Sequence, residues 1–187
     1  MIAEGITLPE ITFKTRTRVS EEGENPFDWK DMTTQDYFSG KRCVLFALPG
    51  AFTPVCSASH LPDYEKLYND IKAKGIDEVY CLSVNDAFVM RKWGLDQGLE
   101  EDREVGSLGF KNVKLIPDGT CEFTRSLGMN CVWGSERGFG ERSWRYSAVI
   151  NDCVVEKVFI EQPFIQNSKA DPLEVSDANT MMNYLSQ

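Results

Sequence analysis

The sequence has a single histidine among its 187 residues, and no pair of its six cysteines follows a C-x-x-C spacing. One histidine leaves few candidate ligands for a zinc site, and the missing C-x-x-C argues against disulfide exchange by a paired-cysteine motif. No apolar run approaches the roughly 20 residues that a membrane helix needs, so no membrane span is expected. The first residues, MIAEGITLPEITF, lack a basic region followed by an apolar stretch. We therefore expect no secretory signal and a cytoplasmic, reducing location.

Basic residues are also in the minority. The chain has 20 Lys and Arg residues against 29 Asp and Glu residues, which gives a net charge of −9. A surface of this charge repels phosphate backbones, so we expect no nucleic-acid partner. With 42% hydrophobic residues the chain can bury one sizeable core, and we expect a single domain over residues 1–187. Because such a core does not depend on disulfides, we expect most of the thiols to be reduced.

Strand and helix patterns alternate along the chain. The predicted strands are an exposed strand at 11–19, buried strands at 42–48 and 77–84, a strand at 112–120 that ends in a Pro-Asp-Gly turn, and a hairpin at 145–161 that turns at Asn151-Asp152. The predicted helices are 33–38, 54–74, 86–96, 121–129 and 175–187, and segment 20–29 is turn-rich. This alternation indicates an α/β domain with a central mixed β-sheet flanked by helices.

One cysteine stands where a thiol can become reactive. In PGAFTPVCSASHLP (49–62) the apolar strand ends at a Pro-Gly pair and a helix begins at Thr53 or Pro54, so that Cys56 falls in its first turn. The unpaired backbone N–H groups and the positive end of the helix dipole there favour a thiolate. A larger thiolate fraction gains only about thirty-fold in nucleophile, so a fast thiol enzyme must also stabilise its transition state. A buried structural cysteine at a helix start fits the local sequence equally well.

Longer motifs decide between these two interpretations. Pro49, Thr53 and Cys56 fit the P-x-x-x-T-x-x-C signature of peroxiredoxins, in the form that resembles the peroxiredoxin-5 and plant type II subfamily. Further segments that resemble this subfamily are CLSVNDAFVMRKW (81–93, with Ala87 where a proline is common), PDGTCEFTRSLGM (117–129) and GFGERSWRYSAVI (138–150). The end, EVSDANTMMNYL (174–185), is most similar to the peroxiredoxin half of bacterial peroxiredoxin–glutaredoxin fusions. The resemblance covers nearly the whole chain and implies a thioredoxin-like fold.

The resemblance also implies a role for each matching residue. Cys56 would be the peroxidatic thiolate that attacks the O–O bond, and the Thr53 hydroxyl would bind the peroxide or the sulfur. Pro49 would shield the thiol, and Arg145 would hold both thiolate and peroxide. A planar cation with five donors suits the negative charge that builds on the leaving oxygen. Arg142 is the competing arginine, to which we assign support or an interface. The family further implies a homodimer, formed by one face of the 88–93 segment and residues near the active-site loop.

The single histidine and Cys81 are open alternatives. His60 follows Cys56 by four residues, so a Cys–His pair is conceivable, but a histidine that packs or caps locally is the preferred interpretation. Cys81 matches the second cysteine of plant type II enzymes and is the candidate resolving residue, although thiols in apolar strands are usually inert. Segment 162–175 has no cysteine, so the route of animal peroxiredoxin-5 is not available.

The other cysteines receive no catalytic role. Cys43 and Cys153 are expected at core or turn positions, and Cys121 is expected near a helix start, outside the signature. Cys131 falls between two motifs, where we expect a loop thiol rather than a regulatory or glutathionylated one.

The expected function is a thiol peroxidase that reduces hydrogen peroxide and organic hydroperoxides. We expect no metal or cofactor, and recycling by glutathione, as co-substrate, with a separate glutaredoxin; thioredoxin and a Cys56–Cys81 disulfide are the alternatives. A peroxide sensor or holdase that uses the same oxidation of Cys56 is the second expectation.

Overall fold

The computed structural model describes all residues from 1 to 187, and its centre is a five-stranded sheet in the order β5-β4-β3-β8-β9. These strands are β3 (Arg42–Leu48), β4 (Glu78–Ser83), β5 (Lys114–Pro117), β8 (Tyr146–Asn151) and β9 (Val154–Ile160). Strands β3, β4 and β5 pair in parallel, whereas β8 is antiparallel to both β3 and β9. The sheet is therefore mixed, as the sequence predicted, and β3 lies at its middle.

Strand β3 is apolar from Cys43 to Leu48 because both of its faces are covered there. Cys43, Leu45 and Ala47 belong to one buried cluster, while the alternate residues of the strand belong to another. This is the period of two that a pleated strand imposes on its side chains. The first cluster packs beneath the short helices α1 (Thr34–Phe38) and α4 (Glu122–Ser126).

The other face of the sheet is covered by the three longer helices. These are α2 (Leu61–Lys72), α3 (Ala87–Asp96) and α5 (Ala178–Leu185). Tyr64 from α2, Trp93 from α3 and Met181 from α5 meet in the second cluster. Asp86 caps α3 and Asp177 caps α5 through their carboxylates. Each helix is too short or too polar to cross a bilayer.

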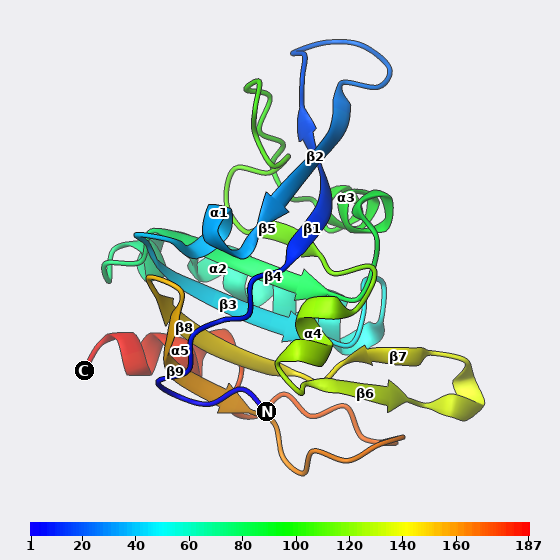
Figure 1. Cartoon of the computed structure of the whole chain (residues 1–187), viewed down its shortest axis with the longest axis vertical. Coiled ribbons are helices and arrows are strands. Elements are labelled where there is room, and N and C mark those ends of the chain that lie inside the picture. The colour runs from blue at the N-terminus through cyan, green and yellow to red at the C-terminus, as the bar shows by residue number, and fades with distance from the viewer.

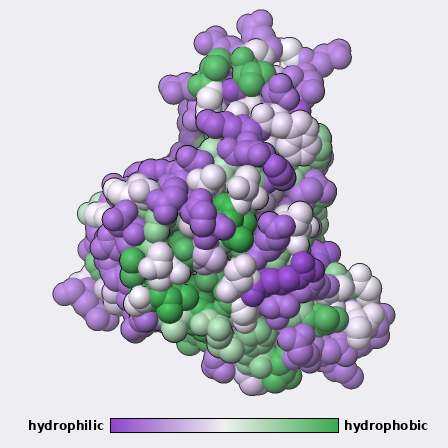
Figure 2. Space-filling view, viewed as in Figure 1, coloured by the Kyte–Doolittle hydropathy of each residue, from purple (hydrophilic) through white to green (hydrophobic).

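Two hairpins project from the sheet. One is formed by β1 (Thr12–Arg18) and β2 (Phe27–Thr33), and it extends with its loop to the top of Figure 1. The other is formed by β6 (Asn130–Trp133) and β7 (Gly140–Ser143), and it extends to the right in the same view. Figure 2 shows that the upper projection carries mostly hydrophilic residues, with a small hydrophobic patch near its end.

Several local predictions were wrong. The turn-rich segment 20–29 ends in strand β2, and Cys131 lies buried in strand β6 rather than in a loop. The turn of the 145–161 hairpin is Asp152-Cys153, one residue later than predicted, because Asn151 still pairs with Val154. Asp152 and Cys153 both have positive φ angles, 46° and 65°, as a two-residue hairpin turn of this hand requires.

Candidate active site

Cys56 lies at the N-terminal end of the helical segment that leads into α2. Helical backbone begins at Pro54, so Cys56 is in the first turn, as the sequence predicted. From Cys56 to His60 the backbone is a π-helix, in which the N–H of Leu61 donates to the carbonyl of Cys56. A π-helical turn holds one residue more than an α-turn, and such turns are frequent at functional sites. Sequence reasoning did not predict this π-helical turn.

The guanidinium of Arg145 lies against the Cys56 sulfur. Its Nη2 donates to Cys56 Sγ at 3.5 Å and to Asp171 Oδ1 at 2.5 Å, and its Nη1 donates to His60 Nδ1 at 2.9 Å. The Nε–H is buried and has no partner. Burial disfavours the charge of Arg145, but Cys56 and Asp171 outweigh it, and the pKa of Arg145 is raised. The Arg145 cation therefore lies beside the thiol, and its Nε–H donor remains unpaired.

His60 fixes the orientation of this arginine. Its ring is 1% exposed, and its Nε2 lies 3.1 Å from the carbonyl oxygen of Ser176, to which it donates. This assigns the proton to Nε2 and leaves Nδ1 as the acceptor for Arg145. Burial, and secondly the charge of Arg145, lowers the pKa of His60 well below its ordinary value. The imidazole is therefore neutral, and it contacts the arginine rather than forming a Cys–His pair.

The segment before α5 is held in place by a buried carboxylate. Glu161 Oε1 accepts the backbone N–H groups of Glu174, Val175 and Ser176, together with the Ser176 hydroxyl. Because the segment is fastened there, the Ser176 carbonyl faces His60. Sequence reasoning missed Glu161, Ser176 and Asp171, since nothing local relates them to a cysteine more than a hundred residues away.

The loop before Cys56 is tied down on both sides. The Thr53 hydroxyl donates to the Gly50 carbonyl at 2.8 Å, which leaves its oxygen lone pairs available to an incoming O–H donor. The backbone N–H of Ala51 donates to Asn85 at 3.0 Å. Arg142 Nη1 lies 3.5 Å from the Pro49 carbonyl, and a Cβ at Gly50 would lie only 2.7 Å from the same nitrogen. Arg142 thus supports the loop, as expected.

A pocket of about 380 Å³ opens above this loop. Pro49 and Thr53 line it, together with Trp133 and Phe139 from the second hairpin. Cys56 itself has no exposed surface and lies beneath the pocket, in contact with Arg145. The structure therefore brings together all four residues that the sequence selected.

Cys81 lies on strand β4, which pairs with β3, and it is fully buried. Burial, with a smaller contribution from Cys56, raises the pKa of the Cys81 thiol well above its ordinary value. A thiol in this state is a poor nucleophile. Cys43 lies in the core and Cys153 in a turn, as expected, and all six cysteines are unpaired and buried.

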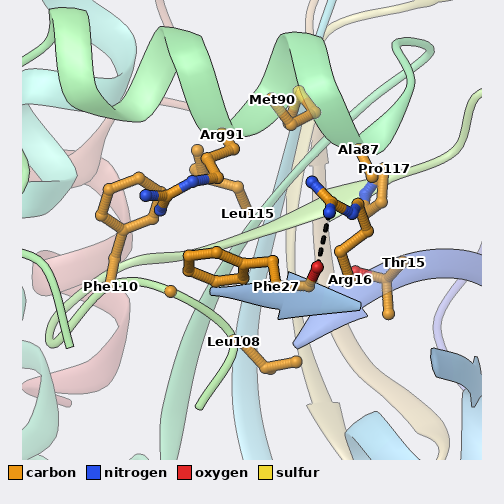
Figure 3. A pocket seen from close by; sticks show the side chains of 11 residues that line it. Thr15, Arg16, Phe27, Ala87, Met90, Arg91, Leu108, Phe110, Leu115 and Pro117 are labelled. Atoms are coloured by element: carbon orange, nitrogen blue, oxygen red, sulfur yellow. Dashed lines mark hydrogen bonds between the residues drawn. The ribbon is translucent and has the colours of Figure 1, made fainter. Parts of the chain in front are cut away.

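A second cavity lies beneath α3 and shares no residue with the Cys56 pocket. Figure 3 shows the guanidinium groups of Arg16 and Arg91 beside Phe27, whose carbonyl accepts a hydrogen bond from Arg16. Its volume is about 20 Å³, which is room for about one water molecule. The cavity is too small for a substrate.

No three His, Cys, Asp or Glu side chains gather anywhere in the chain as metal ligands would.

Known proteins share both the sequence and the fold. The Redoxin family model matches residues 4–181. A peroxiredoxin of Rhizobium etli is 55% identical over 179 residues, covering 95% of this chain and 93% of that protein. The hybrid peroxiredoxin hyPrx5 of Haemophilus influenzae is 44% identical over 182 residues, covering 97% of this chain and 66% of that protein. Among solved structures, the Plasmodium falciparum antioxidant protein, a 1-Cys peroxiredoxin, is 30% identical with a TM-score of 0.86, covering 98% of this chain and 99% of that chain.

The chain belongs to the redoxin family and, within it, to the peroxiredoxins. Its fold is thioredoxin-like, and its activity is that of a thiol peroxidase, an oxidoreductase that acts on peroxides and draws electrons from a thiol.

Proposed function

We propose that this peroxiredoxin reduces hydrogen peroxide and organic hydroperoxides at Cys56, and that glutathione and a glutaredoxin restore the thiol. The observation that supports Cys56 as the reacting residue is its contact with the oriented guanidinium of Arg145. A cation within hydrogen-bond distance favours the thiolate, which is the nucleophilic form.

The first step is a displacement at oxygen. The Cys56 thiolate attacks the distal oxygen of the peroxide, the O–O bond breaks, and the leaving alkoxide or hydroxide takes a proton from solvent. Cys56 becomes a sulfenic acid. In our proposal the unpartnered Nε–H of Arg145 donates to a peroxide oxygen, and the Thr53 oxygen accepts a hydrogen bond from the peroxide O–H. Fixed donors of this kind stabilise the charge that develops in the transition state.

The second step is the reduction of the sulfenic acid, and the environment of Cys81 favours a one-cysteine cycle. Cys81 is buried, and its raised pKa makes it slow to attack the sulfenic acid at Cys56. No cysteine lines the pocket. An external thiol therefore attacks in our proposal, with glutathione as the co-substrate and no cofactor. The similarity to a hybrid peroxiredoxin and to a 1-Cys peroxiredoxin favours this route. Thioredoxin as the reductant and a Cys56–Cys81 disulfide are the alternatives.

A homodimer is part of the proposal. Phe88 at the start of α3 and Phe52 in the active-site loop are 54% and 50% exposed. Phe52 also has a positive φ of 64°, a strained conformation that projects its ring from the loop. Large apolar rings exposed on two segments are typical of an interaction surface.

The test follows peroxide consumption with purified protein, glutathione and glutaredoxin. Cys56→Ser should abolish turnover, whereas Cys81→Ser should retain it. If Cys81→Ser ends turnover, or if peroxide alone gives a stoichiometric Cys56–Cys81 disulfide, the one-cysteine cycle is wrong. Oxidation of Cys56 without turnover by any thiol would favour the peroxide sensor or holdase.

A further inference from the structure

Two cations stand at the mouth of the active-site pocket, and the peroxide step does not use them. Arg137 comes from the loop between β6 and β7, and Lys169 comes from the segment between β9 and α5. Both line the pocket above Cys56 together with Pro49 and Thr53. We propose that Arg137 and Lys169, here called the cationic rim, bind the carboxylates of the thiol that reduces Cys56. This inference rests on the proposed function, because it assigns the recognition of glutathione.

Neither side chain of the cationic rim is committed elsewhere. Arg137 and Lys169 form no ion pair with any carboxylate, although the chain carries nine net negative charges. The one carboxylate that lines the pocket, Asp171, is paired with the buried Arg145. The pocket mouth is therefore a positive region on an acidic protein. Such a region attracts an anion that the remaining surface repels.

The two loops that carry the cationic rim are fastened to each other. The backbone N–H of Val132 donates to Gln166 at 2.8 Å, and the backbone N–H of Asn167 donates to the Val132 carbonyl at 2.6 Å. Ser135 donates to Asn167 Oδ1 from its backbone at 2.6 Å and from its hydroxyl at 3.0 Å. These bonds hold the two cations on one rim before any ligand arrives. Pre-organisation of this kind reduces the entropy cost of binding.

The burial of Cys56 explains why the reductant, rather than the peroxide, needs a recognition site at the rim. Cys56 has no exposed surface, so a bulky thiol reaches its sulfur only when the first turn, Pro54–Cys56, opens into the pocket. The thiol must be retained at the mouth until this occurs. Glutathione carries two carboxylates and one thiol, which suits two cations around an opening that leads to a sulfenic acid.

The chemistry at the rim is a condensation. The glutathione thiolate attacks the sulfur of the Cys56 sulfenic acid, an S–S bond forms, and the S–O bond breaks. The hydroxide leaves and is protonated to water. The thiolate of a glutaredoxin then attacks the glutathione sulfur, takes the glutathionyl group, and releases the Cys56 thiolate.

The experiment compares glutathione with its diethyl ester, in which both carboxylates are capped and the thiol is unchanged. Cys56 is oxidised with one equivalent of hydrogen peroxide in a Cys81→Ser protein, and formation of the mixed disulfide is followed by rapid quench and mass spectrometry. Two exposed ion pairs predict a rate with glutathione roughly 2- to 30-fold higher than with the ester. Arg137→Gln with Lys169→Gln should bring this ratio close to one. The pair Lys30→Gln with Arg103→Gln, exposed residues away from the pocket, changes the net charge equally and should keep the ratio.

The outcomes separate the two proposals. The role of the cationic rim is wrong if the protein with an unaltered rim forms the mixed disulfide equally fast with both thiols, or if the rim variant keeps the wild-type ratio of rates. The glutathione route would stand in either case. If no mixed disulfide forms with either thiol, both proposals fail. A third arm compares a carboxylate-bearing hydroperoxide with its methyl ester in the oxidation step. If the rim variant loses the preference between these two peroxides but keeps the wild-type ratio between the two thiols, the inference is overturned and the rim is assigned to the peroxide.

Discussion

Arg145 donates a hydrogen bond to His60 across 2.9 Å, between residues that are 85 positions apart in the chain. The histidine is the C-terminal residue of the π-helix that begins with Cys56, so one short segment supplies both the thiol and the group that orients its cation. The Ser176 carbonyl completes the arrangement by accepting a hydrogen bond from the other imidazole nitrogen, Nε2. We infer that His60 acts through Arg145 and is a positioning residue rather than a base.

His60→Leu should slow the oxidation of Cys56 by peroxide. Without the Nδ1 acceptor the guanidinium loses one of its fixed contacts, and a displacement of about 1 Å costs up to roughly 100-fold in rate. Tyr64→Phe is the matched control, because the Tyr64 hydroxyl donates to the same Ser176 carbonyl at 2.9 Å without touching Arg145. Stopped-flow measurement of Cys56 oxidation should show a much smaller loss in the control. If both variants lose the same fraction of the oxidation rate, His60 serves only in packing.

Arg145→Met and Thr53→Val should each slow the same step by roughly 10²–10³-fold, since each would remove one group that stabilises the developing charge. Arg142→Met should cost far less, because Arg142 contacts the loop carbonyl of Pro49 and not the sulfur. The measurement is the second-order rate constant with hydrogen peroxide. Normal rates in Arg145→Met would transfer the role to Arg142 or to no arginine.

Phe88→Glu should weaken the proposed homodimer. Phe88 is 54% exposed at the start of α3, where it packs edge-on against Trp29 with ring centroids 5.5 Å apart. A carboxylate in place of the ring removes apolar contact area and must be desolvated in the interface, which costs free energy. Val105→Glu, at a residue that is 62% exposed in the loop between α3 and β5, is the control. Sedimentation velocity at micromolar concentration should give a dimer for the wild type and the control, and a shift to monomer for Phe88→Glu. A monomeric wild type would contradict the proposal.

Gly94→Ala should destabilise the protein, although alanine normally favours a helix over glycine by roughly 1 kcal/mol. A Cβ at this position in α3 would come within 2.5 Å of Phe110 Cε2 and 3.0 Å of Leu115 Cδ1. Forced overpacking of this kind costs about 1–3 kcal/mol. Asn69→Ala, at an exposed site in α2, controls for helix propensity. Urea denaturation should show a lower free energy of unfolding only for Gly94→Ala, and a gain in stability there would disprove the predicted clash.

The sequence predicted the parts of this molecule that depend on local patterns. Strand β3 was found because the run from Cys43 to Leu48 is entirely apolar, and α3 (Ala87–Asp96) lies within the range 86–96 that the sequence predicted as a helix. The second hairpin was missed because β6 and β7 have four residues each. The Arg145–His60 contact was missed because tertiary structure alone brings the two residues together. A motif could indicate Arg145, but no spacing rule links it to a histidine on another element.

The pH dependence of stability offers a clean measurement, because His60 is the only histidine in the chain. Burial and Arg145 lower its pKa in the folded protein, whereas an unfolded histidine titrates near pH 6.5. Below about pH 6.5 the unfolded state therefore binds a proton that the folded state does not, and stability falls with decreasing pH. The slope contributed by His60 approaches about 1.4 kcal/mol per pH unit and vanishes above about pH 7.5. Urea denaturation between pH 5.5 and 7.5 should show this slope in the wild type and not in His60→Leu, since carboxyl groups contribute alike to both proteins. Parallel pH profiles in the two proteins would mean that His60 binds a proton as readily in the folded protein as in the unfolded chain, which contradicts its role as the acceptor for Arg145.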